Sequence, residues 1–420
     1  MKLLTHWPHV KLSDVCVKIG SGVTPRGGES VYLPEGVALI RSQNVYKGRF
    51  HPRGLAFLSD QHAEEMAGVA VEAGDLLLNI TGDSVARCCQ APEAVVPARV
   101  NQHVSIIRPD SDRLDANFLC YYMISPIMQS YLLSLAGSGG TRKALTKEMI
   151  ERFEVPCPPI SSQLAIASFL SHYDDLIANN TRRMALLEQA ARLLFDEWFV
   201  RLRFPGHEHT RLSEGMPDGW TATDLEASCI PIDGIQTGPF GSQLHEYDYT
   251  DEGIPVVMPK DIVGTRIATD DIARVPDSLR DRLSRHILSP GDIVLARRGD
   301  IGRKAFISSR ESGWLCGTGC MRLRPNAQIV EPRFLFETLG RPEVIGIIVS
   351  RAQGAIMPNL NLTIMSDVPV VLPPRSLQRQ FIEYATPMYR QVEVLDQQNQ
   401  KLQEARDLFL PRLMSGQVAV

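Results

Sequence analysis

The sequence lacks the marks of a secreted, membrane-bound or zinc-binding protein. It has eight cysteines in 420 residues, but no Cys-x-x-Cys pair and no histidine at ligand spacing beside them. We therefore predict no zinc site, and cysteines that stay reduced. No run of about 18 uncharged apolar residues occurs anywhere in the chain. We expect neither secretion nor contact with a membrane. We expect the protein to be in the cytoplasm.

Catalytic motifs are missing as well. Neither half of the chain has the Asn-Pro-Pro-aromatic or glycine-rich cofactor motif of a methyltransferase, and the ten histidines form no triad or metal pattern. We therefore expect no catalytic residue and no bound metal. The net charge of −4 argues against indiscriminate binding of polyanions. Contact with DNA would need local basic patches or a basic partner.

What the sequence does contain is a long helix that occurs twice. Pro158 to Gln163 opens the first copy and Pro373 to Gln378 opens the second, in each case with two prolines that end a strand and a serine that can cap a helix. A seam with alternating spacings of four and three follows in the first copy: Ile166, Leu170, Tyr173, Ile177, Asn180, Met184, Leu187, Ala191, Leu194 and Trp198. This heptad pattern predicts a coiled-coil helix that ends at Pro205 and Gly206.

The second copy keeps most of this seam, as Val392, Leu395, Asn399, Leu402, Arg406, Phe409 and Leu413. We predict that the two helices pair with each other as an antiparallel coiled coil. The alternative is an ordinary pair of helices packed on a globular core. Pro387 lies inside the second helix and predicts a kink or a restart there. The residues assigned to helix pairing and partner docking are Leu170, Tyr173, Ile177, Leu187, Leu194, Trp198, Leu395, Leu402 and Phe409.

Internal similarity extends beyond the helices. Short apolar runs that predict strands recur in order: Val37 to Ile40 with Ile254 to Val257, Leu76 to Ile80 with Ile293 to Ala296, and Val104 to Ile107 with Met321 to Leu323. Asn117 to Leu135 predicts a helix, matched by Pro332 to Val349. The offset between the copies falls from 217 to 215 along the chain. Small loop deletions in a duplicated sequence produce such a drift.

The chain is therefore expected to contain two α+β lobes, each followed by a long helix. The boundaries are 1–157 for the first lobe, 158–204 for the first helix, 205–372 for the second lobe and 373–420 for the second helix. A duplication gives an approximate two-fold axis. The natural target with two-fold character is double-stranded DNA that is contacted at two half-sites.

Five stretches carry a resemblance to a known family. They are Pro158-Pro159 followed by Ser161 to Ala167, Leu194 to Val200, Met216 to Trp220, Gly238 to Ser242, and Leu410 to Gly416. In this order and at this spacing the chain resembles, over essentially its whole length, the specificity (S) subunit of type I restriction-modification enzymes. One departure is that Gly20 to Pro25 stands in the first lobe where the second has Gly238 to Ser242.

The resemblance implies two target-recognition domains and two spacer helices in a subunit that performs no chemistry. Such a subunit brings two adenine-methylating (M) subunits to a bipartite, asymmetric DNA site, and often nuclease-translocase (R) subunits as well. The long helices would also be the docking surface for the methyltransferase subunits. S-adenosylmethionine would be bound by those partners and no cofactor by this chain, and base flipping would belong to the same partners.

Candidate DNA-contacting residues are polar or basic side chains in loops that leave strands. They are Arg41, Gln43, Asn44, Arg142, Lys143, Ser242, Gln243, Lys260, Arg297, Arg298, Arg303 and Lys304. Arg142 and Lys143 belong to a glycine-rich loop whose amides could approach a phosphate closely. Arg297 to Lys304 is the densest basic cluster of the second lobe.

Two other functions stay open at this point. Asp75 with Asp83, repeated as Asp292 with Asp300, would suit a metal-dependent enzyme that cleaves DNA. A structural role for them is favoured, because Gly-Asp before an apolar run is ordinary turn chemistry at the start of a strand. The third possibility is an interaction scaffold that never touches DNA.

Overall fold

The structure, a computed structural model, describes residues 7–137, 143–269, 271–352 and 359–418. The chain divides into two compact units. The first unit comprises Met1–Arg182 together with Leu395–Val420, and the second comprises Arg183–Val394. Each unit therefore contains one lobe and parts of both long helices.

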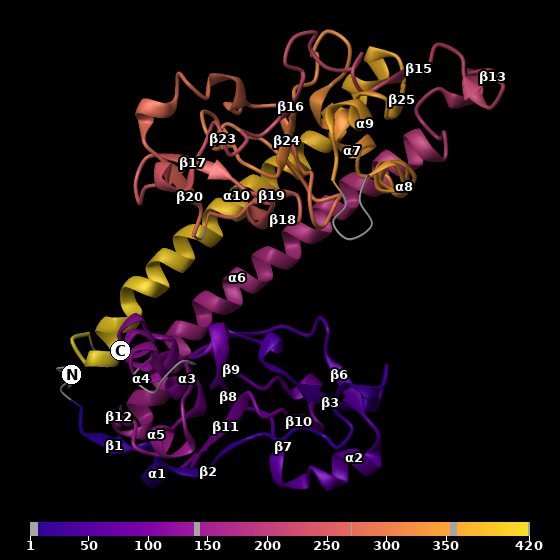
Figure 1. Ribbon diagram of the computed structural model, residues 1–420. Helices are drawn as coiled ribbons and strands as arrows, with labels where there is room; N and C mark the ends of the chain where they lie inside the picture. The colour runs from indigo at the N-terminus through magenta and orange to yellow at the C-terminus, as the bar shows by residue number, and fades with distance from the viewer. Residues whose placement is uncertain (1–6, 138–142, 270, 353–358, 419–420) are drawn as a thin grey trace. The chain divides into compact units, whose positions relative to one another are not determined.

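Two four-stranded sheets form the first lobe (Figure 1). One has the order β2 (Cys16–Ser21), β11 (Val104–Pro109), β8 (Leu76–Asn79) and β9 (Cys88–Gln90), and the other has β6 (Ala56–Leu58), β3 (Val37–Ile40), β10 (Ala98–Val100) and β7 (Ala70–Val71). Two further pairs are β1 (His9–Lys11) with β12 (Glu154–Pro156) and the hairpin of β4 (Val45–Tyr46) and β5 (Arg49–Phe50). All contacts are antiparallel except that of β3 with β10. The predicted strands of this lobe are present as β3, β8 and β11.

The second lobe repeats this topology, except that none of its described strands matches β7. One sheet has the order β16 (Ile235–Thr237), β24 (Cys320–Leu323), β21 (Ile293–Ala296) and β22 (Lys304–Phe306). The other has the order β20 (Ala273–Val275), β17 (Ile254–Val257) and β23 (Leu315–Cys316). The two-stranded pairs recur as β15 (Thr221–Asp224) with β25 (Pro369–Leu372) and β18 (Ile262–Val263) with β19 (Arg266–Ile267). β17 and β23 are parallel, as β3 and β10 are. A small extra hairpin, β13 (Leu212–Ser213) with β14 (Met216–Pro217), lies in the linking segment. The predicted duplication is thus confirmed at the level of topology.

Each lobe has two helices where the sequence predicted one. They are α3 (Ala116–Ile124) and α4 (Pro126–Gly137) in the first lobe, and α7 (Pro332–Thr338) and α8 (Pro342–Arg351) in the second. The prediction of one continuous helix is wrong because a proline pushes the preceding residue out of the helical region. Ser125 and Arg341 are accordingly extended, with ψ of 146° and 137°. The short helices are α1 (Leu12–Val15), α2 (Asp60–Glu65), α5 (Lys147–Glu151) and α9 (Leu362–Ser366).

The long helices begin where the prolines predict. They are α6 (Ile160–Phe195), which continues into a π-helical turn at Asp196–Val200, and α10 (Arg375–Ser415). Pro387 does not interrupt α10, so the predicted restart is wrong, whereas the predicted kink stays a prediction. Phe381, Ala385 and Tyr389, on both sides of the proline, are buried in the second unit's core. This packing holds the helix across the missing backbone hydrogen bond, because tertiary contacts outweigh local propensity.

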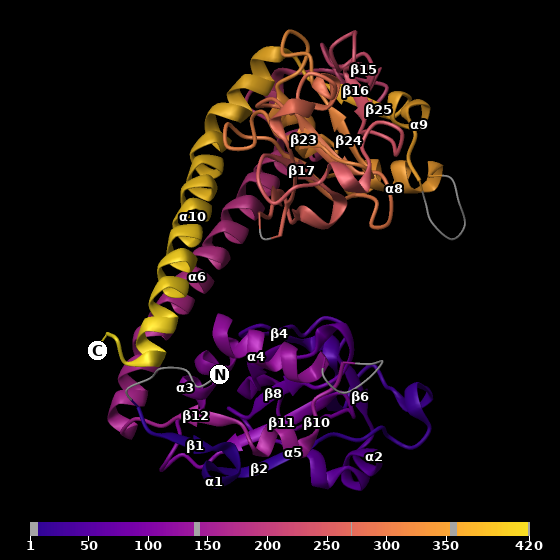
Figure 2. The ribbon, with the colours of Figure 1, turned by 60° about the vertical axis from the view of Figure 1, so that its left-hand side comes forward.

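The two long helices pair in the first unit. The Phe169 and Phe409 rings lie 5.5 Å apart, Arg406 donates to Asp174 at 2.6 Å, and Asn180 donates to Asn399 at 3.0 Å. Residue numbers rise along α6 as they fall along α10, so the helices are antiparallel. Figure 2 shows the end of α10 beside the start of α6, and the core of this unit contains residues of both.

The same antiparallel contact occurs in the second unit. Phe195 packs on Phe381 with ring centroids 5.6 Å apart, and Trp198 packs on Tyr384 at the same distance. Of the residues assigned to pairing, Leu170, Ile177, Trp198 and Leu395 are buried, and Tyr173, Leu187, Leu194, Leu402 and Phe409 are half-buried. Antiparallel pairing is thus confirmed within each unit.

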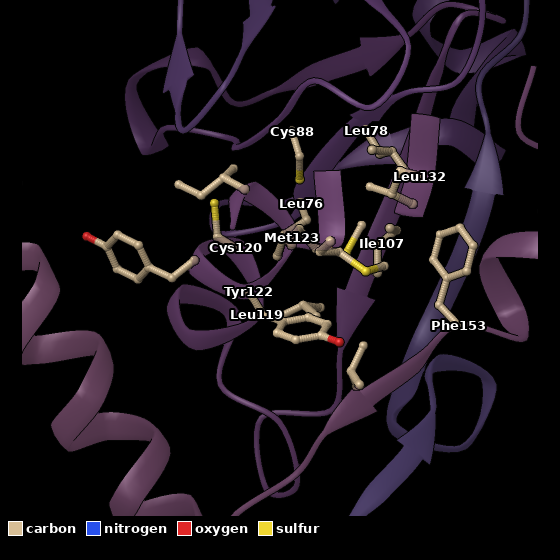
Figure 3. Close-up of a cluster of buried hydrophobic side chains, with 14 of the residues drawn as sticks. Leu76, Leu78, Cys88, Ile107, Leu119, Cys120, Tyr122, Met123, Leu132 and Phe153 are labelled. Atoms are coloured by element: carbon tan, nitrogen blue, oxygen red, sulfur yellow. The ribbon is translucent and has the colours of Figure 1, made fainter. Parts of the chain in front are cut away.

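The core of the first lobe lies between its helices and a sheet. Figure 3 shows Leu119 and Met123 of α3 among Leu76, Leu78 and Ile107 of the β2-β11-β8-β9 sheet. No single helix of the described residues is long and apolar enough to cross a membrane. Only α3 and α4 together have the length and composition, at a bend of 70°, and most of the α3 side chains are buried in this core.

Candidate nucleic-acid interface

The loop after β3 holds the first group of predicted DNA-contacting residues. Asn44 is fully buried: its Oδ1 accepts a hydrogen bond from the Arg41 amide at 3.0 Å, and its Nδ2 donates to the His51 carbonyl at 2.9 Å. Asp261 accepts in the same way from the Met258 amide of the second lobe at 2.8 Å. Asn44 therefore shapes the turn from inside. The prediction that it contacts DNA is corrected, because no part of its side chain is accessible.

Arg41 and Gln43 stay accessible but are tied to the neighbouring loop. Both donate to the Gly54 carbonyl, at 2.7 and 2.9 Å, and the Arg41 guanidinium lies 5.3 Å from the centre of the Tyr32 ring. Gly54 has a φ of 69°, and a Cβ there would lie 2.8 Å from the Gln43 amide nitrogen, so the contact requires glycine. The two side chains thus hold a fixed surface beside the β4–β5 hairpin.

That hairpin carries a concentration of positive charge that the sequence reasoning missed. Lys47, Arg49 and Arg53 are all exposed, and no Asp or Glu occurs between Gly36 and Ser59. We call Tyr46, Lys47, Arg49, Arg53 and Arg87 the basic hairpin. Because the whole chain has a net charge of −4, this segment is the kind of local patch that contact with a phosphate backbone requires. The run without carboxylates was the signal that could have found it.

An aromatic side chain lies among these cations. Tyr46 is 42% exposed, with the Arg87 guanidinium 4.9 Å from its ring centre and the His51 ring at 5.5 Å. The cation–π contact fixes the ring before any ligand arrives. An exposed tyrosine flanked by cations suits packing against sugars or bases, with the phosphates on either side.

The basic hairpin is anchored to the sheet beneath it. Asn79 of β8 is fully buried, and its Nδ2 donates to the Ser42 carbonyl at 2.9 Å. With Asn44 it holds both ends of the loop that leads into the hairpin. A recognition element held by buried hydrogen bonds is pre-organised, which favours specificity.

The second lobe has the corresponding hairpin without this charge. Lys260, in the turn before β18, donates to the Asp271 carbonyl at 3.2 Å, and Arg266 of β19 is 3.8 Å from the Glu188 carboxylate. Lys260 itself is exposed. The lobes thus share a scaffold but present different side chains.

Exposed aromatic residues occur in another loop of the second lobe, which follows β16. Phe240 is 52% exposed and Tyr247 is 80% exposed, in the segment that also holds the exposed Ser242 and Gln243. The His245 ring stacks on Tyr247 at 4.9 Å. We call residues 238–249 the aromatic loop. Exposed aromatic groups of this size mark interaction surfaces, and Gly238 to Ser242 was singled out in the sequence for the resemblance it carries.

Two predicted cations of the second lobe point inward. Lys304 is buried, donates from Nζ to the Phe336 carbonyl at 2.6 Å, and has its pKa lowered to about 7 by burial. Arg297 is 7% exposed and donates from Nε to the Leu360 carbonyl at 3.1 Å. The prediction that Lys304 contacts DNA is corrected, because its amine is used inside the fold. Arg297 uses only its Nε in these bonds, so its contact with DNA stays a prediction.

The remaining candidates have mixed positions. Arg298 is exposed, and Arg303 is exposed but paired with Asp300 at 2.7 Å. Lys143 is exposed, whereas Arg142 lies outside the described residues. These cations stay predictions.

The repeated aspartates have equivalent partners. Asp75 accepts two hydrogen bonds from Arg108, at 2.7 and 2.8 Å, and Asp292 accepts two from Arg324, both at 2.7 Å. Each carboxylate also accepts an amide of its own turn, from Glu72 and Ser289. Among the described residues no group of three or more His, Cys, Asp or Glu side chains could hold a metal ion. The bidentate arginine contacts favour the structural role over the metal-dependent one.

Most of the cysteine thiols lie inside the fold. All eight cysteines are free, and Cys88, Cys89, Cys120, Cys229, Cys316 and Cys320 are buried. Burial raises the pKa of Cys89, Cys229 and Cys316 to about 12, which keeps these thiols protonated and unreactive.

The comparisons with known proteins agree with this arrangement. The model of the type I restriction modification DNA specificity domain matches residues 6–189 and 253–404. The MjaIX specificity subunit of a type I restriction enzyme from Methanocaldococcus jannaschii is 23% identical, over 100% of this chain and 95% of its own. The HindI specificity subunit from Haemophilus influenzae is 22% identical, over 99% of this chain and 100% of its own.

A solved structure shares the fold. The crystal structure of a type I restriction-modification S subunit from M. genitalium aligns with a TM-score of 0.54 and 16% identity, covering 98% of this chain and 97% of that one. At this identity the likeness concerns the fold alone. It extends over both lobes and both long helices.

Proposed function

The chain belongs to the family of type I restriction-modification DNA specificity subunits, and we propose that it recognises a bipartite, asymmetric DNA site with one half-site for each lobe. The observation that carries this proposal is the basic hairpin. It places exposed cations and an oriented tyrosine on a segment without carboxylates, as binding to a phosphate backbone and its bases requires.

The asymmetry of the site follows from what the lobes do not share. Their sheets follow the same strand orders, except that no described strand of the second lobe matches β7, and the basic hairpin of the first lobe corresponds to a poorly charged hairpin in the second. Different side chains on one scaffold read different bases, because base contacts and not the scaffold specify sequence. Two unlike half-sites are the expected result.

We further propose that the chemistry belongs to partner subunits. Two adenine-methylating subunits would bind S-adenosylmethionine, nuclease-translocase subunits would join in a complete restriction system, and this chain would bind no cofactor. The bidentate Asp75–Arg108 and Asp292–Arg324 pairs support a non-catalytic role, because they occupy the buried carboxylate of each repeat. The compartment that we propose is the cytoplasm.

The face of α6 that points away from the helix seam supports docking of these partners. In the second unit Leu186 and Leu193 of α6 are 56% and 51% exposed and lie seven residues apart. This spacing puts them on one side of the helix. Leu186→Glu with Leu193→Glu should reduce co-purification of a methyltransferase subunit and leave the unfolding midpoint unchanged. Leu33→Glu with Leu133→Glu, at exposed leucines of the first lobe, is the matched control and should leave co-purification unchanged.

The proposal is tested on the complex of the full chain with its methyltransferase subunits. The complex methylates a random-sequence DNA library, and sequencing then identifies the contexts of the methylated adenines. We expect two short unlike words separated by a fixed gap. A single contiguous word, or no sequence preference, would contradict the proposal. A complex whose affinity for DNA does not depend on salt would instead favour the scaffold.

A further inference from the structure

Each lobe is attached to the helix that follows it through the same pair of positions. The first position is a buried glutamine near the start of the helix. The Gln163 Oε1 accepts from the Asp115 amide at 2.8 Å, and the Gln378 Oε1 accepts from the Glu331 amide at 2.9 Å. Each glutamine also donates to a carbonyl of its own double proline at 2.8 Å. These equal contacts fix which residues of the two units correspond.

The second position has the donor and the acceptor exchanged. In the first unit Tyr121 of α3 donates its hydroxyl to Asp174 of α6 at 2.6 Å. In the second unit the tyrosine is on the long helix, and Tyr389 of α10 donates to Glu337 of α7 at 3.0 Å. Tyr121 and Glu337 are equivalent residues counted from Asp115 and Glu331, and Asp174 and Tyr389 are equivalent counted from the glutamines.

The cations near the tyrosine–carboxylate contact also differ between the two units. Arg406 donates to Asp174 at 2.6 Å in the first unit. In the second unit the buried Lys304 lies near Glu337, which counteracts the lowering of the Lys304 pKa, and the Arg333 guanidinium lies 4.4 Å from the Tyr389 ring centre.

The first lobe has no such cations at the matching positions. Cys88 stands at the first-lobe position of Lys304, because Lys304 pairs with Leu295 of β21 and Cys88 pairs with the equivalent Leu78 of β8. Asn117 stands at the first-lobe position of Arg333. The second lobe thus has two cations near its own carboxylate. The first lobe, which carries a tyrosine at that position, has neither cation.

We infer that the exchanged tyrosine–carboxylate contact matches each lobe to one long helix. The first lobe, with its tyrosine, requires a helix that carries a carboxylate, and the second lobe, with its carboxylate, requires a helix that carries a tyrosine. A second lobe placed before α6 would bring the Glu337 carboxylate against Asp174, and like charges at hydrogen-bond distance repel. The order of the lobes is therefore restricted, whichever DNA sequence each one reads.

The test reverses one contact at a time in the full chain, and thermal unfolding is measured. Tyr121→Phe removes only the hydrogen bond and should lower the midpoint of the first unit by about 2–4 °C. Tyr121→Glu should lower it at least about twice as far, because two carboxylates then face each other. Adding Asp174→Tyr to Tyr121→Glu recreates the arrangement of the second unit and should bring the midpoint back to at least that of Tyr121→Phe.

The result that would overturn the inference is equal midpoints for Tyr121→Phe and Tyr121→Glu, or a double variant no more stable than Tyr121→Glu alone. If Tyr121→Glu does not fold, recovery of folded chain in the double variant supports the inference, and failure to recover contradicts it. In the second unit, Tyr389→Asp should lower the unfolding midpoint more than Tyr389→Phe does. Adding Glu337→Tyr to Tyr389→Asp should raise the midpoint again.

A lobe exchange tests the consequence directly. Residues 9–157 are replaced by a second copy of 222–372, with and without Asp174→Tyr in α6. We expect a higher unfolding midpoint when Asp174→Tyr is present, and equal midpoints would count against the inference. Because these measurements need no DNA, their failure would leave the proposed recognition of DNA untouched.

Discussion

Asn180 and Asn399 form a buried side-chain hydrogen bond, Nδ2 to Oδ1 at 3.0 Å, in the seam between α6 and α10 of the first unit. The Asn399 amide also donates to the Ile177 carbonyl at 3.3 Å. A polar pair in an apolar seam is satisfied in one alignment of the helices only, because any shift would bury its atoms without partners. The pair therefore specifies the register of the two helices.

We predict that Asn180→Leu destabilises the first unit by about 1–3 kcal/mol, because the Asn399 side-chain oxygen then loses its donor. Asn180→Leu with Asn399→Leu should recover most of this loss but weaken the preference for one register. Urea unfolding gives the stability, and hydrogen exchange along α6 reports the register. Asn179→Leu, at an exposed position, serves as control and should change stability by less than about 0.5 kcal/mol. Equal effects at Asn179 and Asn180 would contradict the assignment.

The basic hairpin should account for part of the salt dependence of DNA binding. Lys47→Ala with Arg49→Ala should reduce the slope of log affinity against log salt by about 2, since each lost phosphate contact removes about 0.9. The readout is titration of the methyltransferase complex with DNA at several salt concentrations. Lys147→Ala with Arg152→Ala removes the same charge from the exposed surface of α5 and should leave the slope as it is. A change of the same size in both variants would mean that only net charge matters.

The repeated aspartates should stabilise the fold and perform no catalysis. Asp292→Asn breaks the bidentate contact with Arg324 and should destabilise the second unit by about 3 kcal/mol. Asp75→Asn should do the same in the first unit. Unfolding is measured together with cleavage of plasmid DNA in magnesium. Asp83→Asn, at an exposed position, is the control and should change neither. Loss of a cleavage activity without loss of stability in Asp292→Asn would revive the catalytic alternative.

The sequence predicted the parts of the fold that depend on periodicity. The strands at 37–40, 254–257 and 293–296 have the predicted bounds, and both long helices start after their double prolines. The breaks before Pro126 and Pro342 were missed because the apolar spacing continues across each proline. The helix also does not restart at Pro387, because packing of Phe381 and Tyr389 outweighs the local signal.

The candidate site was predicted less well, because charge alone does not say which way a side chain points. Lys304 was assigned to the surface from its basic neighbours, yet its strand is covered by α7, with Nζ 3.3 Å from the Phe336 ring centre. Asn44 has the side chain of a base-reading residue, but three backbone partners hold it inside the turn. The exchanged Tyr121 and Glu337 correspond in sequence, but their meaning depends on contacts with residues more than 50 positions away.

Lys304 makes the stability of the second unit depend on pH. Burial lowers its pKa to about 7 from the ordinary lysine value of 10.5. Between these values the unfolded chain holds a proton that the folded chain has lost, so stability rises with pH over this window and falls as pH drops towards 7. Lys304→Met removes this dependence. The stability of Lys304→Met relative to the unaltered chain should therefore fall between pH 7 and pH 10. The expected fall is on the order of a few kcal/mol, because one pH unit within this window corresponds to about 1.4 kcal/mol.

Urea midpoints at several pH values give the measurement for Lys304→Met, and Lys143→Met, at an exposed position, should follow the unaltered chain. Parallel curves for Lys304→Met and the unaltered chain would contradict the prediction. They would mean that the buried amine keeps its proton throughout, through its contacts with Glu337 and the Phe336 carbonyl.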